Sequence, residues 1–167
     1  DRYGLESVID LEHPQAATQL EQHLTQPGWE RLWIIADAMR FGWPVSTIQQ
    51  LTHIDPWFLE AIQTILSIEE RLRTQTLKTL TEDQLRLIRQ QGLSDQRISA
   101  LLNCTHTDVR AQRLKAGITP VYKRVDSCAA EFPTPTAYLY SSYETTCEAD
   151  PTSATSVMVL GSGPNRI

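Results

Sequence analysis

Apolar residues recur at spacings of three and four along the first 117 residues, and this pattern predicts a series of amphipathic helices. We expect four helices, over residues 14–23, 30–41, 45–51 and 55–73. Three shorter helices should follow, each beginning at a capping residue: Thr81, Ser94, and Thr105 or Thr107. The caps, the stops and the apolar pattern agree with one another, which favours a small multi-helix domain.

The longest of these expected helices has Asp55 as its N-cap and Pro56 as its first residue, and both residues favour a helix start. Its apolar side chains form one stripe that should face a core: Phe58, Ile62, Ile65, Ile68 and Leu72. Glu69 and Arg73 lie four residues apart, so we expect them to pair on the solvent face. A stripe of this kind is typical of helical core and does not indicate a cofactor site.

The helix expected at residues 30–41 is apolar around nearly its whole circumference, which predicts burial by its own core or by a partner. Four tryptophans fall in the same region: Trp29, Trp33, Trp43 and Trp57. Buried tryptophans often dominate protein interfaces, so these four are candidate interface residues for self-association. The alternative is that they fill the helical core.

The character of the chain changes after residue 117. Several prolines exclude long helices there, and tyrosines alternate at Tyr138 and Tyr140, which predicts an extended segment over 118–156 with one packed face. The apolar run Val157–Leu160 then stops at Gly161, as a strand of a parallel sheet does before a glycine turn. We therefore expect three parts, a helical domain at 1–117, a connecting segment at 118–156, and the first strand of an α/β domain at 157–167. A strand and a turn do not complete a domain, so we expect a piece of a longer protein.

Composition and charge limit the possible functions. The chain has 167 residues, of which 41% are hydrophobic and 21% charged, and this balance is typical of a globular protein. Its net charge of −5 argues against attraction to nucleic acid or to anionic membranes. No apolar run approaches the roughly 20 residues that span a bilayer, and the first residues do not resemble a secretory signal. We expect a cytoplasmic protein.

Residues that carry chemistry are few. The three cysteines, Cys104, Cys128 and Cys147, form no CxxC pair and no zinc-type spacing with histidine, so we expect reduced thiols. The sequence contains no Ser/His/Asp set and no carboxylate pair in an apolar setting. We therefore assign no catalytic, cofactor-binding or metal residue to this chain.

Two alternative functions are suggested by local patterns. Residues 92–117 have the helix, turn and helix of a DNA-binding module, but residues 81–117 contain six basic and four acidic side chains, a small surplus for contacting phosphates. The pair Gly161 and Gly163 after an apolar run suggests a dinucleotide loop. The sixth position of that motif is Arg166 rather than glycine, which makes the signal weak.

Three separated runs resemble one known family. VYKRVDSCAAEF at 121–132, TAYLYSSYE at 136–144 and VMVLGSGPNRI at 157–167 resemble, in this order, the middle of the large chain of carbamoyl-phosphate synthase. The helical stretches at 29–41 and 55–70 are similar to the same family. Ser127, Ser142 and Ser162 depart from its pattern as small-for-small changes, whereas Pro133 and Pro135 stiffen the segment more than the family pattern suggests.

The resemblance implies that the chain is the helical oligomerisation domain joined to the start of the second synthetase half, which is of ATP-grasp type. It implies for the whole enzyme a ligase that makes carbamoyl phosphate from glutamine-derived ammonia, bicarbonate and ATP, for arginine and pyrimidine synthesis. Magnesium and potassium, a small glutamine amidotransferase chain and the remaining domains of the large chain are the implied cofactors and partners. The catalytic halves lie outside the matched runs, so no catalytic residue is carried over.

Overall fold

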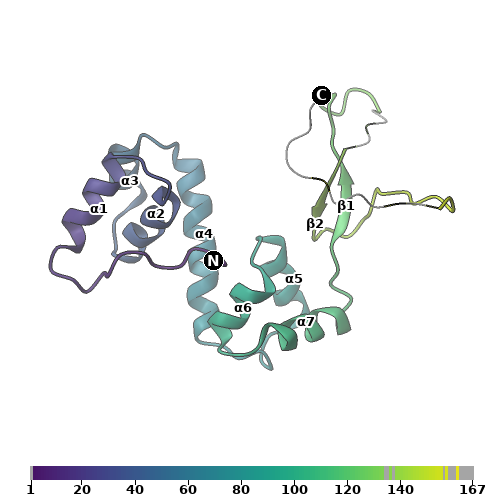
Figure 1. Cartoon of the computed structure of the whole chain (residues 1–167), viewed down its shortest axis with the longest axis horizontal. Coiled ribbons are helices and arrows are strands. Elements are labelled where there is room, and N and C mark those ends of the chain that lie inside the picture. The colour runs from purple at the N-terminus through teal and green to yellow at the C-terminus, as the bar shows by residue number, and fades with distance from the viewer. Residues whose placement is uncertain (1, 134–135, 137, 156, 158–160, 162–167) are drawn as a thin grey trace. The chain divides into compact units, whose positions relative to one another are not determined.

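The computed structural model describes residues 2–133, 136, 138–155, 157 and 161. The chain divides into two compact units, residues 1–119 and residues 120–167 (Figure 1). The first unit is helical and the second holds a short β-hairpin, so the mainly α fold expected from the sequence is confirmed.

The first half of the helical unit packs three short helices against the start of a long one. These are α1 (Ala16–Thr25), α2 (Arg31–Arg40), α3 (Val45–Thr52) and α4 (Pro56–Arg73) (Figure 1). Their apolar faces close one core, made of Ile9, Ala16, Leu20, Leu24, Ile34, Ile35, Ala38, Ile48 and Leu59.

The second half of the helical unit contains α5 (Glu82–Gln90), α6 (Asp95–Leu102) and α7 (His106–Lys115). Here α6 contacts both α4 and α7. The buried side chains of this half are Leu72, Leu80, Leu85, Ile88, Ile98, Leu101, Leu102, Val109 and Ile118. Because α4 contacts α2 and α3 as well as α6, this long helix joins the two halves of the unit.

The helix caps expected from the sequence are confirmed. The Asp55 side chain accepts a hydrogen bond from the backbone N–H of Trp57 at 2.9 Å. Thr81 and Gln84 form the reciprocal capping box of α5. Ser94 and Thr105 cap α6 and α7 through their hydroxyl groups.

Two expectations for α4 are wrong. Glu69 does not pair with Arg73 on the solvent face, because its side chain is only 3% exposed and is bound by Arg97 and Arg40. Phe58 does not belong to the buried stripe, since it is 57% exposed while its neighbour Leu59 is fully buried. In both cases the spacing along α4 showed which residues share a face of the helix. Whether that face is buried depends on how distant segments pack against it.

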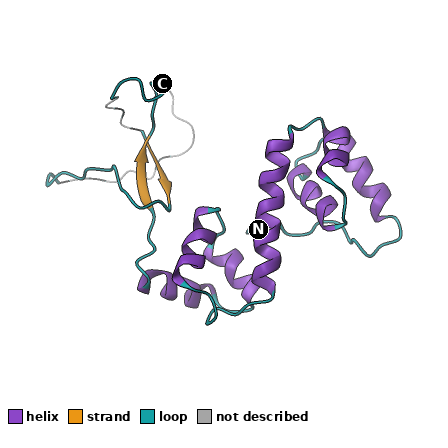
Figure 2. Cartoon of the chain, turned by 180° about the vertical axis from the view of Figure 1, so that it is seen from behind, coloured by secondary structure: helices purple, strands orange, loops and turns teal. Residues whose placement is uncertain are grey.

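The second unit pairs β1 (Val121–Arg124) with β2 (Leu139–Ser142) in an antiparallel sheet, coloured orange in Figure 2. Val121 lies opposite Ser142 in this register. The predicted extended character is confirmed for these strands, but within the unit Tyr138 and Tyr140 are exposed rather than packed. Apart from Val157 and Gly161, the strand and glycine turn expected at 157–163 lie outside the described residues.

Candidate interaction surface

An exposed aromatic cluster lies at the start of α2. Trp29 is 79% exposed and meets the half-buried Trp33 edge to face, with 6.4 Å between ring centroids. The guanidinium of Arg2 lies over both rings, 5.3 Å from the centroid of Trp29 and 5.0 Å from that of Trp33. Arg2 also pairs with Glu30 at 2.7 Å. Cation–π contacts and this ion pair therefore hold the two indole rings in place at the surface.

A shallow groove continues from this cluster. The indole N–H of Trp33 donates to the backbone carbonyl of Gly4 at 2.8 Å, which fixes the ring against the amino-terminal segment. Tyr3 and Leu32 are 49% and 46% exposed, and with Trp33 they line a groove of about 280 Å³. We call Tyr3, Trp29, Leu32 and Trp33 the α2 patch, an apolar surface on a fixed backbone.

The other two candidate tryptophans lie in different surroundings. Trp43 packs against the core of α1–α4 and contacts Phe41 edge to face, with 6.2 Å between ring centroids. Trp57 is 69% exposed and contacts Phe58 at 4.9 Å in the first turn of α4. The structure thus brings Trp29 and Trp33 together, and among the described residues no ring contact joins them to the Trp57 pair.

A buried ionic network supports the amino-terminal segment behind the patch. Asp37 is fully buried, and its carboxylate accepts hydrogen bonds from the backbone N–H groups of Val8 at 2.7 Å and Ile9 at 3.0 Å. Arg40 bonds to Asp37, to Glu69 and to the carbonyl of Leu5.

Glu69 completes the network from α4. Its two carboxylate oxygens accept from Nε and Nη2 of Arg97, each at 2.6 Å, in a bidentate pair. This network was not predicted from the sequence. The only available signal was the presence of Asp37 and Glu69 among apolar positions of their helices.

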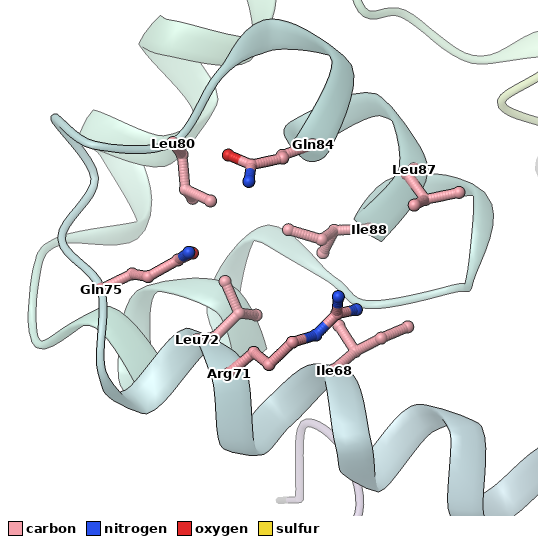
Figure 3. Close-up of a pocket in the computed structure, with 8 residues that line it drawn as sticks. All are labelled: Ile68, Arg71, Leu72, Gln75, Leu80, Gln84, Leu87 and Ile88. Carbon is pink, nitrogen blue, oxygen red and sulfur yellow. The ribbon is translucent and has the colours of Figure 1, made fainter.

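The pocket in Figure 3 lies between the end of α4 and α5. It is lined by Ile68, Arg71, Leu72, Gln75, Leu80, Gln84, Leu87 and Ile88. Its volume is about 70 Å³. Since ligand pockets begin at about 300 Å³, this pocket is too small for a metabolite.

The ionisable side chains of the described residues do not assemble into a reactive centre. Within these residues, no three His, Cys, Asp or Glu side chains lie close enough to hold a metal ion. Burial, followed by the nearby charge of Asp108, raises the pKa of the Cys104 thiol. Hydrogen bonds from the backbone N–H groups of Tyr122 and Ala149 lower the pKa of exposed Cys147. None of the helices in the described part of the chain is long and apolar enough to cross a bilayer.

The helix-turn-helix alternative at residues 92–117 is not favoured by the placement of its basic residues. Arg97 is buried and paired with Glu69, and Arg113 is buried and paired with Asp95 at 2.9 Å. Arg89 also lies 3.5 Å from Asp95. Of the six basic side chains of residues 81–117, these three are neutralised inside the protein. The remaining three provide little charge for contacting several phosphates.

Comparison with known proteins agrees with the helical architecture. Residues 1–117 match the family described as carbamoyl-phosphate synthetase large chain, oligomerisation domain. The chain is 48% identical over 164 residues to a carbamoyl phosphate synthase large chain of Pseudomonas putida, covering 98% of this chain and 15% of the relative. It is 47% identical over 164 residues to the large chain of Vibrio vulnificus, with the same coverage.

A third relative, the carbamoyl phosphate synthase large chain of Xanthomonas axonopodis, is 46% identical over 167 residues, covering 99% of this chain. The chain spans 15–16% of the length of these curated relatives. The match therefore includes the hairpin unit as well as the helices. The chain belongs to the carbamoyl-phosphate synthetase large chain family, and its helical unit is the oligomerisation domain of that family.

Proposed function

We propose that the helical unit joins copies of a carbamoyl-phosphate synthase large chain through the α2 patch. The observation that carries the proposal is Trp29, a large apolar ring that is 79% exposed although Arg2 and Trp33 hold it in one place. Tryptophan is enriched among residues that dominate binding energy. A ring that is already fixed in the free protein loses little conformational entropy on binding.

A symmetric contact suits this patch. In a two-fold interface the same surface of each copy meets itself, so one self-complementary patch is sufficient. The apolar rings would occupy the centre, and the pair between Arg2 and Glu30 would lie at the rim, where exposed ion pairs add little affinity. An interface of standard size buries on the order of 800 Å² per partner, so we expect the contact to extend beyond the four patch residues.

Sedimentation equilibrium of the 167-residue chain over a wide concentration range tests the proposal. Trp29→Ala should weaken self-association by roughly 1,000-fold, because a two-fold contact loses the residue from both copies, at about 2 kcal/mol each. Thermal unfolding should change little, because Trp29 is exposed. Trp57→Ala is the matched control, since Trp57 is also exposed and paired with a ring.

The results separate three outcomes. Weakening by Trp29→Ala alone supports the α2 patch. If only Trp57→Ala weakens self-association, the contact lies at the start of α4, and this result contradicts the proposal. A chain that stays monomeric at millimolar concentration removes the case for self-association through either tryptophan.

For the whole protein we propose the activity that the relatives' names imply, a ligase that forms carbamoyl phosphate. Its expected substrates are glutamine-derived ammonia, bicarbonate and ATP, with magnesium and potassium as cofactors, a small amidotransferase chain as partner and the cytoplasm as location. No residue of this chain is assigned to ATP or to a metal, because the described carboxylates are committed to internal ion pairs or spread over the surface. Carbamoyl phosphate formation by the purified 167-residue chain would contradict this assignment.

We also propose the domain division that the sequence suggested, with the helical domain at 1–117, a connecting segment at 118–156 and the start of an α/β domain at 157–167. The hairpin supports the middle part of this division. Two-stranded sheets are marginally stable alone, and Tyr122, Tyr138 and Tyr140 are exposed within the second unit. We expect Val121–Glu144 to be covered by other parts of the large chain. Amide exchange in this segment as slow as that of α4 in the 167-residue chain would contradict the idea.

A further inference from the structure

The first turn of α6 holds the amino-terminal segment on one side. Ser94 Oγ donates to the carbonyl of Tyr3 at 3.5 Å. Arg97 donates to the carbonyl of Leu5 at 3.4 Å and lies 3.7 Å from the carboxylate of Glu6. Three contacts, from Tyr3, Leu5 and Glu6, are therefore made to two side chains of one helical turn.

The same turn also holds the end of the helical unit. Nε and Nη2 of Arg113 bind the Asp95 carboxylate at 3.1 Å and 2.9 Å. The third guanidinium nitrogen of Arg113, Nη1, donates to the carbonyl of Ile118 at 2.7 Å. Arg113 is buried and Ile118 fully so, and the second unit begins only two residues later, at Pro120.

We propose that residues 94–97 form a clamp that couples the amino-terminal segment to the junction between the two units. Ser94, Asp95 and Arg97 share one turn, so they cannot shift independently without breaking the start of α6. The Asp95–Arg113 pair is mostly buried, and loss of one partner leaves a charge without compensation. On the other side, Arg97 is fixed by its buried pair with Glu69 of α4 and from there contacts Leu5 and Glu6. Loosening at residues 3–6 is therefore transmitted to Ile118, and loosening at Ile118 to residues 3–6.

Other contacts define how far the coupling extends. Residues 8 and 9 are held by Asp37 on α2, not by α6, and Arg40 shares the Leu5 carbonyl with Arg97. The clamp thus concerns residues 3–6 and leaves residues 8 and 9 attached to α2. Local coupling should therefore change protection at residues 3–6 and not at residues 8 and 9, whereas a general loss of stability would change both. The proposal does not depend on self-association.

Hydrogen exchange measured by NMR on the 167-residue chain tests the clamp in both directions. Exchange at residues 3–6 is followed through the indole N–H of Trp33, which donates to the carbonyl of Gly4. Asp95→Asn weakens the grip on Arg113, and we expect exchange at residues 3–6 to rise about tenfold together with that at residues 116–119. Arg97→Lys loses the bidentate pair with Glu69 and the Leu5 contact, and should raise exchange at residues 116–119 by a similar factor. Asp83→Asn, the same chemical change in the first turn of α5, is the control and should change neither segment.

The clamp is overturned if Asp95→Asn raises exchange only at residues 116–119 or Arg97→Lys raises it only at residues 3–6. It is also overturned if exchange rises evenly over α1–α7, because that result indicates general destabilisation. If Arg97→Lys does not fold, Asp95→Asn decides alone, by whether residues 3–6 respond while residues 8 and 9 keep their protection.

Discussion

Replacing Glu69 by Gln should remove much of the stability of the helical unit. The wild-type carboxylate accepts two hydrogen bonds of 2.6 Å from Arg97 and one of 3.2 Å from Arg40. The amide of Gln keeps one acceptor oxygen, but turns an NH₂ group toward a guanidinium and carries no charge. Two arginines then remain partly buried without their shared anion.

The expected loss is about 3–5 kcal/mol, the usual cost of breaking a buried ion pair by removing one partner. A unit of this size has a total stability of roughly 6–18 kcal/mol, so the loss is a large share of it. With an m-value of about 1.5 kcal/mol per molar urea, the midpoint of unfolding should fall by roughly 2–3 M.

Urea unfolding followed by circular dichroism at 222 nm measures this shift. Glu70→Gln is the matched control, since Glu70 is the next residue of α4 but is exposed. We expect the control to change stability by less than about 0.5 kcal/mol. Equal midpoints for the two variants would refute the argument that the buried network stabilises the unit.

Two further predictions concern single contacts. Asp55→Ala should cost about 1 kcal/mol in thermal or urea unfolding, because the backbone N–H of Trp57 loses its cap, and Asp55→Asn should recover most of it. Beside the hairpin, hydrogen bonds from the Lys123 side chain and the Arg124 N–H lower the pKa of Glu148. The contribution of this carboxylate to stability is therefore fully present above about pH 4.3, the pKa of an unperturbed Glu, and is lost as the pH falls through the lower pKa that Glu148 has in the folded protein. The NMR signal of the Arg124 amide should titrate with a midpoint below pH 4.3, and Glu148→Gln should abolish that step; a midpoint at or above 4.3 would contradict it.

Local signals in the sequence predicted the helical elements well. Caps such as Asp55, Thr81 and Ser94 depend on residues within one turn of each other, so their chemistry is readable from sequence. The antiparallel pairing of 121–124 with 139–142 was not predicted, only the extended character of the segment. An extended character follows from prolines and alternating tyrosines, but strand register depends on contacts across a connection that no local pattern specifies.

The ionic network was not predicted, for a physical reason. Glu69 and Arg97 are 28 residues apart, and a charged position beside Ile68 looks the same in sequence whether it faces water or a distant arginine. The spacing to Arg73 therefore favoured the wrong partner. For the candidate surface, the sequence indicated the tryptophans as a group, but only the structure distinguishes exposed Trp29 from Trp43, which packs on the core.

The position of Arg97 has a consequence for synthesis of the chain on the ribosome. Its guanidinium binds the carbonyl of Leu5 across a separation of 92 residues. At translation rates of about 5–20 residues per second, Leu5 is made roughly 5–18 s before this partner exists. During that interval α1–α3 have enough sequence to collapse, but the amino-terminal segment lacks α6. Chaperones that recognise extended apolar segments would therefore find the residues around Leu5 most accessible in nascent chains that end before α6, because Val8 and Ile9 are already held by Asp37 of α2.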